Sequence, residues 1–256
     1  MNFALIYRVA SANLIYWTDG NWRIASKYAQ FGKPMIAPLR PNEVLDKTLA
    51  NWDTIFRAKA KELYPAQDPA HDFLHVCRVV RNAIHLARIE GADLNIVLPA
   101  GYFHDYVNLA KDDPKRKQAS TMSAVAALDY LSKVDYPNQF LGGIEHAIAA
   151  HSFSAQIRPE SIEAKVIQDA DRLDALGAIG IARCFSTAAR LGTPYYSIGD
   201  PWAVERHIDD KQYAIDHFPA KLFQIAETMQ TESAQIEARK RVIFMKDYLT
   251  QMQDEM

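Results

Sequence analysis

Four residues in the middle of the chain have the types and the order of a metal-binding set. The centre is the pair His104-Asp105, with His75 upstream and Asp171 downstream. Two imidazole nitrogens and two carboxylates suit a divalent ion of the Mn, Fe, Co, Ni or Zn kind. The apolar run 96–98 predicts a buried pair, and because an isolated buried charge is costly, a metal ion would be its partner. The dipeptide alone is more typical of an ordinary helix end, so the hypothesis depends on the whole set.

Predicted helices must bring these residues together. The first begins at Asp68-Pro69, the pattern of an N-cap followed by proline at the first helical position, and carries His75. The second begins at Asp93 and carries His104-Asp105, and Pro99 within it predicts a kink or a late start. Neighbouring residues of a helix project about 100° apart, so both members of the pair can reach one ion.

The rest of the body is also predicted to be helical, which makes the fold all-α. Apolar residues recur at helical spacing over 42–64. Further helices are expected at about 120–133, capped by Ser120 or Thr121, at about 138–150, from near Pro159 to Leu176 with Asp171, on to about Arg190, from Asp200-Pro201, and over the last residues.

Composition narrows the class of protein. The 256 residues, 49% of them hydrophobic, are enough for one domain with a large core, and a net charge of −2 gives no basic surface for nucleic acid. No apolar run reaches the length of a membrane helix, and Cys77 and Cys184 are too few and too far apart for a disulfide framework. We expect a cytoplasmic protein with no nucleic-acid or membrane partner, and a homodimer stays open.

Residues 1–41 differ from the body. Asp19-Gly20 lies between the β-rich runs 14–18 and 21–24, which predicts a hairpin, and a proline-rich stretch follows. An unstructured extension is the alternative. We therefore expect two parts, an N-terminal extension over 1–41 and a helical domain over 42–256.

The ordered set of histidines and aspartates on a helical chain resembles the HD-domain metal-dependent phosphohydrolases. Within that family, several spaced segments resemble the bacterial YedJ- and YpgQ-like subgroup: 71–79, His104-Asp105 with Lys111-Asp112 and Ala119-Ser120, 168–177, and His217-Phe218 with Lys221-Leu222. The resemblance covers about 45–250 and does not include the extension.

The resemblance implies an HD helical bundle that binds one divalent metal ion through His75, His104, Asp105 and Asp171. It also implies hydrolysis of a phosphate ester or anhydride, with nucleoside or deoxynucleoside triphosphates as the expected substrates. Mn²⁺ is the expected ion, and Fe, Co, Ni, Zn and Mg stay open. The ion would activate a water molecule for attack on phosphorus. Other branches of the family carry glutamate where this chain has Asn108, which cannot act as a base, so the general base is left open.

Cationic donors are needed for the substrate phosphates. We expect catalytic roles for Asp105, Lys111 and Arg78, and substrate contacts from Arg78, Lys111, Arg116, His146 and His151. The last two could bind phosphate or protonate the leaving group, or they could pack as a helix-end pair.

Two neighbouring aspartates have other expected roles. Asp174, one turn from Asp171, is expected to orient a metal ligand or Arg172, and Asp169 is expected to be structural. Two other functions stay open beside triphosphate hydrolysis. One is a phosphomonoesterase or phosphodiesterase acting on a nucleotide, and the other is a non-catalytic nucleotide-binding regulator.

Overall fold

The structure is a computed structural model that describes residues 6–9, 13–18, 21–26, 45–64, 72–109 and 113–256. The chain divides into two compact units, Met1–Leu45 and Asp46–Met256. Each unit is described by itself.

The first unit contains a three-stranded antiparallel sheet in the order β1-β2-β3. Its strands are β1 (Ile6–Val9), β2 (Asn13–Thr18) and β3 (Asn21–Ser26). The pairing of Thr18 with Asn21 confirms the expected hairpin. Its turn residues, Asp19-Gly20, lie outside the described residues. Strand β1, which pairs with β2, was not predicted.

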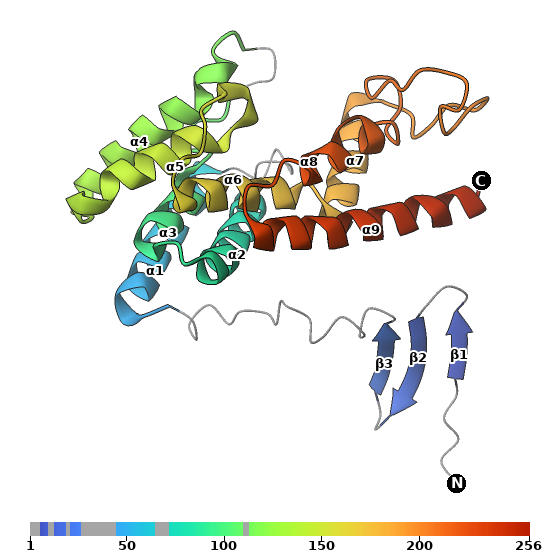
Figure 1. Ribbon diagram of the computed structural model, residues 1–256, viewed down its shortest axis with the longest axis horizontal. Coiled ribbons are helices and arrows are strands. Elements are labelled where there is room, and N and C mark those ends of the chain that lie inside the picture. The colour runs from blue at the N-terminus through green and yellow to red at the C-terminus, as the bar shows by residue number, and fades with distance from the viewer. Residues whose placement is uncertain (1–5, 10–12, 19–20, 27–44, 65–71, 110–112) are drawn as a thin grey trace. The chain divides into compact units, whose positions relative to one another are not determined.

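The described part of the second unit is helical and contains no strand, which confirms the all-α prediction for the body (Figure 1). Its α-helices are α1 (Lys47–Leu63), α2 (Phe73–Glu90), α3 (Leu94–Phe103), α4 (Ala119–Lys133), α5 (Leu141–His151), α6 (Ile162–Asp174), α7 (Gly177–Leu191), α8 (Phe223–Ala226) and α9 (Glu232–Asp254). Short 3-10 turns lie at Arg116–Gln118, Asn138–Phe140 and Phe153–Ala155, and a π-helical turn lies at Phe218–Leu222.

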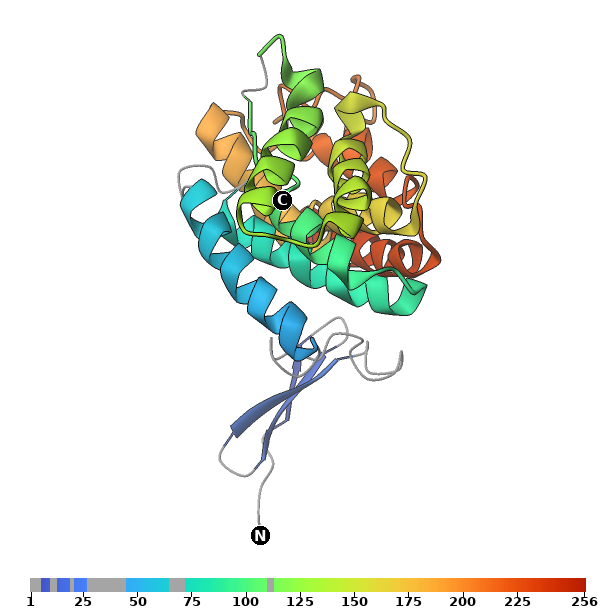
Figure 2. The same ribbon diagram turned by 90° about the vertical axis from the view of Figure 1, so that its left-hand side faces the viewer.

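The centre of the bundle is formed by α2, α3, α5 and α6, which pack on one another. Helices α4 and α5 run side by side in both views (Figures 1 and 2), and α9 packs on α7. No helix among the described residues has the length and hydropathy that crossing a membrane requires.

An aromatic cluster joins α1 to α3. Phe56, Tyr102 and Phe103 are completely buried, and the ring of Phe56 meets that of Phe103 edge-on at 5.3 Å between centroids. Tyr136 adds an edge contact to Trp52 at 4.9 Å. Each such ring removes a large apolar area from water, so the cluster anchors the helix that ends at the expected metal site.

Proline at position 99 is accommodated inside α3. The helix begins at Leu94 after its N-cap Asp93, so neither a late start nor an interruption is observed. Proline has no N–H to donate to the carbonyl four residues earlier, which belongs to Asn95. That carbonyl accepts a hydrogen bond of 2.6 Å from the hydroxyl of Tyr136 instead. A distant side chain therefore replaces the missing backbone donor.

Three helix boundaries differ from the sequence prediction. Helix α2 begins at Phe73 behind the cap Asp72, and the expected cap Asp68 with Pro69 lies outside the described residues. Neither Ser120 nor Thr121 caps α4, which begins before them at Ala119, and the buried hydroxyl of Ser120 donates to the carbonyl of Ala149 instead. No helix begins at Asp200-Pro201, since the Asp200 carboxylate accepts the backbone N–H groups of a turn at 204–206.

Candidate metal and phosphate site

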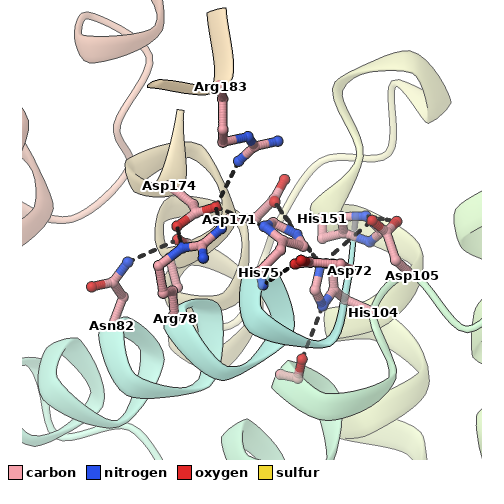
Figure 3. Close-up of polar contacts among 12 residues, drawn as sticks. Asp72, His75, Arg78, Asn82, His104, Asp105, His151, Asp171, Asp174 and Arg183 are labelled. Atoms are coloured by element: carbon pink, nitrogen blue, oxygen red, sulfur yellow. Dashed lines mark hydrogen bonds and ion pairs between the residues drawn. The ribbon is translucent and has the colours of Figure 1, made fainter. Parts of the chain in front are cut away.

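Three of the four expected metal ligands converge at one point of the bundle (Figure 3). The Nε2 atom of His75 lies 3.3 Å from Nε2 of His104 and 3.5 Å from Oδ1 of Asp171. The distance from His104 Nε2 to the same carboxylate oxygen is 3.9 Å. These three residues, from α2, from the end of α3 and from α6, each offer one ligand atom within 4.8 Å of the others.

The ends of the helices place these side chains. His75 lies in the first turn of α2, where its backbone N–H donates to the carboxylate of the cap Asp72 at 2.8 Å. His104 is the residue that follows α3 and was expected within it. His75 and His104 are buried, while the side chain of Asp171 is 31% exposed. The site is therefore walled by the bundle and open on the side of α6.

The hydrogen bonds of the two histidines fix which ring nitrogens face the site. Nδ1 of His75 donates to Asp174 at 2.8 Å, and Nδ1 of His104 donates to the carbonyl of Gly101 at 2.9 Å. Carboxylate and carbonyl oxygens only accept, so Nδ1 carries the proton in each ring, and in the neutral form of the ring Nε2 carries the lone pair. Burial lowers the pKa of His104 and favours this neutral ring. Two lone pairs and a carboxylate that face one another repel unless a cation lies between them, so the donor set fits a divalent ion.

Asp105, the fourth expected ligand, lies between two histidines in the turn after α3. One carboxylate oxygen lies 3.6 Å from Nε2 of His104, and the other lies 3.4 Å from Nε2 of His151. His151 is buried at the end of α5 and donates from Nδ1 to the carbonyl of Ile148 at 2.7 Å. Burial opposes the charged ring, but the hydrogen bond and the charge of Asp105 raise the pKa of His151. Metal ligation by Asp105 stays a prediction.

A polar pocket includes Asp105 and His151 in its lining and does not include His104. It is lined by Asp105, Val107, Asn108, Arg116, Ala119, Ser120, His151, Ser152 and Ser154. Arg116 reaches it from the short turn before α4, and its Nη1 donates to the carbonyl of Leu109. Two of the expected substrate contacts, Arg116 and His151, therefore line one pocket beside an expected metal ligand.

The other expected substrate contacts lie elsewhere. Arg78 uses both Nε and Nη2 to bind Asp174, at 2.6 and 3.0 Å. His146 accepts the backbone N–H of Glu160 at 3.0 Å and is not among the residues that line the pocket. Lys111 lies outside the described residues. The roles of all three toward substrate stay predictions.

Asp174 is the centre of a network that the sequence revealed only in part. It orients the ligand His75, as one of its two expected roles required, whereas Arg172 donates to the carbonyl of Thr228. Asp174 also accepts a 2.6 Å bond from Arg183 of α7, a residue that sequence reasoning missed. Burial alone would raise the pKa of Asp174, but the hydrogen bonds from His75 and Arg78 and the charge of Arg183 hold it far below its usual range.

Asp169 has the expected structural role. Its buried carboxylate accepts the backbone N–H groups of Gln230 and Thr231 and the hydroxyl of Thr231, with distances of 2.8 to 3.1 Å. Asp169 therefore connects α6 to the start of α9, and all of these hydrogen bonds are made away from the candidate metal ligands.

The sequence matches a known protein family and a curated relative. Residues 72–176 match the family model described as HD domain. These residues include the three converging ligands, Asp105 and Asp174. The chain is 32% identical over 201 residues to the uncharacterized protein YpgQ of Bacillus subtilis (strain 168), covering 77% of this chain and 90% of that protein.

Solved structures agree with this comparison. The Bacillus subtilis YpgQ structure in complex with ADP has a TM-score of 0.63 at 32% identity, and the match covers 80% of this chain and 97% of that one. An HD-superfamily hydrolase from Bacillus thuringiensis has a TM-score of 0.63 at 28% identity, covering 81% of this chain and 97% of the other.

Proposed function

The chain belongs to the HD superfamily of hydrolases, and on that premise we propose that it is a phosphohydrolase that cleaves nucleoside or deoxynucleoside triphosphates. The observation that carries the proposal is the convergence of His75, His104 and Asp171, each of which offers one ligand atom within 4.8 Å of the others. We assign one divalent ion to this set, with Mn²⁺ as the proposed ion and Asp105 as the fourth ligand.

Each ligand has a physical reason to hold a cation. The Nδ1 hydrogen bonds fix the orientation of both histidine rings, so the rings need no rearrangement before they bind a cation. Asp171 brings the negative charge and lies at the open side, where a substrate can approach. A divalent ion held by these residues would supply an activated water molecule and would neutralise charge on a phosphoryl oxygen.

The polar pocket supports the assignment of a phosphate substrate. Among the described residues, the guanidinium of Arg116 has its hydrogen bond with the Leu109 carbonyl through one nitrogen, which leaves other donors for an anion. His151 closes the pocket against Asp105 and can donate a proton to a leaving oxygen. Lys111, five residues before Arg116 in the sequence, is proposed as a second phosphate contact. The ADP in the complex of YpgQ supports a nucleotide as the substrate.

The experiment is a substrate screen on the metal-stripped protein reloaded with Mn²⁺. Nucleoside tri-, di- and monophosphates are incubated with it, and phosphate and pyrophosphate are detected separately. The proposal predicts turnover of triphosphates that depends on added metal. Release of phosphate from monophosphates alone would replace the proposal with a phosphomonoesterase, and binding without turnover of any nucleotide would replace it with a regulator.

Two substitutions separate the metal from the substrate. Asp171→Ala removes a charged ligand and should abolish both metal binding and hydrolysis. Lys111→Ala should leave metal binding intact, because an ammonium group has no lone pair, and should reduce kcat/KM by about 2–4 kcal/mol of transition-state stabilisation. Lys133→Ala is the matched control, since Lys133 forms an exposed ion pair with Asp129. If Lys111→Ala turns over triphosphate as the control does, the phosphate role of this loop is wrong.

A further inference from the structure

Asp174 joins three helices directly behind a metal ligand. Asp174 lies at the end of α6, and its carboxylate accepts a hydrogen bond from Nδ1 of His75 in α2. It also accepts hydrogen bonds from two guanidinium groups, those of Arg78 in α2 and Arg183 in α7 (Figure 3). Its side chain is only 2% exposed, while those of Arg78 and Arg183 are 30% and 21% exposed. A carboxylate this deeply buried is held in one position by all three partners.

The two ring nitrogens of His75 face different surroundings. Nδ1 faces Asp174, and Nε2 faces His104 and Asp171. A ring that carried its proton on Nε2 would point an N–H at the metal and a lone pair at a carboxylate. Both contacts would be unfavourable. The carboxylate behind the ring therefore selects the form that can bind a cation.

We propose that Asp174 is a positioning residue for the metal site, held in place by Arg78 and Arg183, and that it keeps the proton of His75 on Nδ1. The inference assigns to Arg78 a role different from the substrate contact expected from sequence, because two of its nitrogens bind Asp174. It also gives a role to Arg183. It rests on the proposed metal site but not on the identity of the substrate.

The geometry distinguishes two substitutions of Asp174. Oδ2 accepts from His75, from Arg183 and from Nη2 of Arg78, whereas Oδ1 accepts from Nε of Arg78. In Asp174→Asn, the amide oxygen is expected to take the place of Oδ2, so the bond from His75 survives. In Asp174→Ala, nothing remains to accept it. The Mn²⁺ affinity of the asparagine variant should thus lie between that of the parent and that of the alanine variant.

The test measures the ring and the metal directly, without substrate. Correlation spectra of ¹⁵N-labelled imidazoles in the metal-free protein report which nitrogen of His75 carries the proton, and His75→Gln assigns its signal. Calorimetric titration with Mn²⁺ reports affinity. The parent should show the Nδ1–H form. Asp174→Ala should populate the Nε2–H form and bind Mn²⁺ about 10–100-fold more weakly, as expected when a group behind a metal ligand is lost.

A matched control separates positioning from general stability. Asp169 is also a buried carboxylate of α6, and it contacts Gln230 and Thr231. Asp169→Asn should lower the melting temperature while leaving the His75 form and Mn²⁺ affinity unchanged. If Asp174→Ala does not fold, Asp174→Asn still tests the proposal, since it should weaken Mn²⁺ binding relative to Asp169→Asn.

Two outcomes would overturn the proposal. One is Mn²⁺ affinity and a His75 ring form in the Asp174 variants that match the Asp169→Asn control. The other is an Arg78→Gln variant that keeps parental Mn²⁺ affinity and ring form but loses nucleotide binding, which would make Arg78 a substrate contact. Both readouts are obtained without turnover, so a protein that hydrolyses no triphosphate would refute the proposed function and leave this test intact.

Discussion

The hydroxyl of Tyr136 should stabilise the helix that carries His104, and its removal is a quantitative test. Tyr136→Phe keeps the ring contacts with Trp52 and Phe56 but removes the donor to the Asn95 carbonyl, which Pro99 leaves without its helical partner. This hydrogen bond is only partly buried, so its loss should cost about 0.5–1.5 kcal/mol, the net contribution of a typical intramolecular hydrogen bond. At about 2–4 °C per kcal/mol for a domain of this size, the melting temperature should fall by roughly 1–6 °C.

The assay is thermal and urea unfolding of a double-mutant cycle. Pro99→Ala restores an N–H that can donate to Asn95, so Tyr136→Phe should cost less in that background than in the parent. Tyr130→Phe is the control, because no hydrogen bond of its hydroxyl is seen among the described residues; it should change stability by about 0.5 kcal/mol or less. An equal cost of Tyr136→Phe with and without Pro99 would refute the account of how α3 accommodates proline.

Three further predictions concern other parts of the chain. Deletion of residues 1–41 should leave Mn²⁺ affinity and melting temperature nearly unchanged, because the HD resemblance begins after it; a large loss of stability in unfolding scans would contradict this. Burial and the nearby Asp210 carboxylate raise the pKa of Cys184 to about 11, so iodoacetamide should alkylate it slowly at pH 8 in the native protein and quickly after denaturation, as mass spectrometry would show. In steady-state kinetics, His151→Ala should reduce kcat/KM at least tenfold and His146→Ala should not, and equal effects would mean that the pocket contact of His151 is irrelevant.

The convergence of His75, His104 and Asp171 could be predicted because their types and their order along the chain match those of a metal-ligand set. His75, His104 and Asp171 could be selected by chemistry alone, and the helices that carry them follow from apolar periodicity. Asp174 was also within reach, since one helical turn separates it from Asp171. These inferences need only local geometry, which sequence spacing determines.

Contacts that depend on how helices pack could not be read in the same way. Arg183 lies on α7, and its approach to Asp174 depends on the turn at Gly177, whose φ of 72° suits glycine. Asp200-Pro201 has a helix-start pattern, yet Asp216 binds Arg206 and stabilises an irregular segment there instead. Here a tertiary ion pair outweighs the local preference for a helix start.

Arg78 shows a different limit of prediction from sequence. An arginine one turn from a metal ligand can serve substrate or protein, and spacing does not distinguish the two. The inference that Arg78 serves the protein rests on the buried carboxylate of Asp174 at 2.6 Å, which comes from another helix 96 residues later. Only the packed structure shows that partner.

The central claim is that His75, His104, Asp105 and Asp171 hold one divalent ion. Anomalous diffraction from a crystal of the full chain soaked in Mn²⁺ tests it most directly. One strong peak is expected in the bundle, in contact with Nε2 of both histidines and with both carboxylates. A peak located away from these residues, or none at a Mn²⁺ concentration that supports turnover, would contradict it.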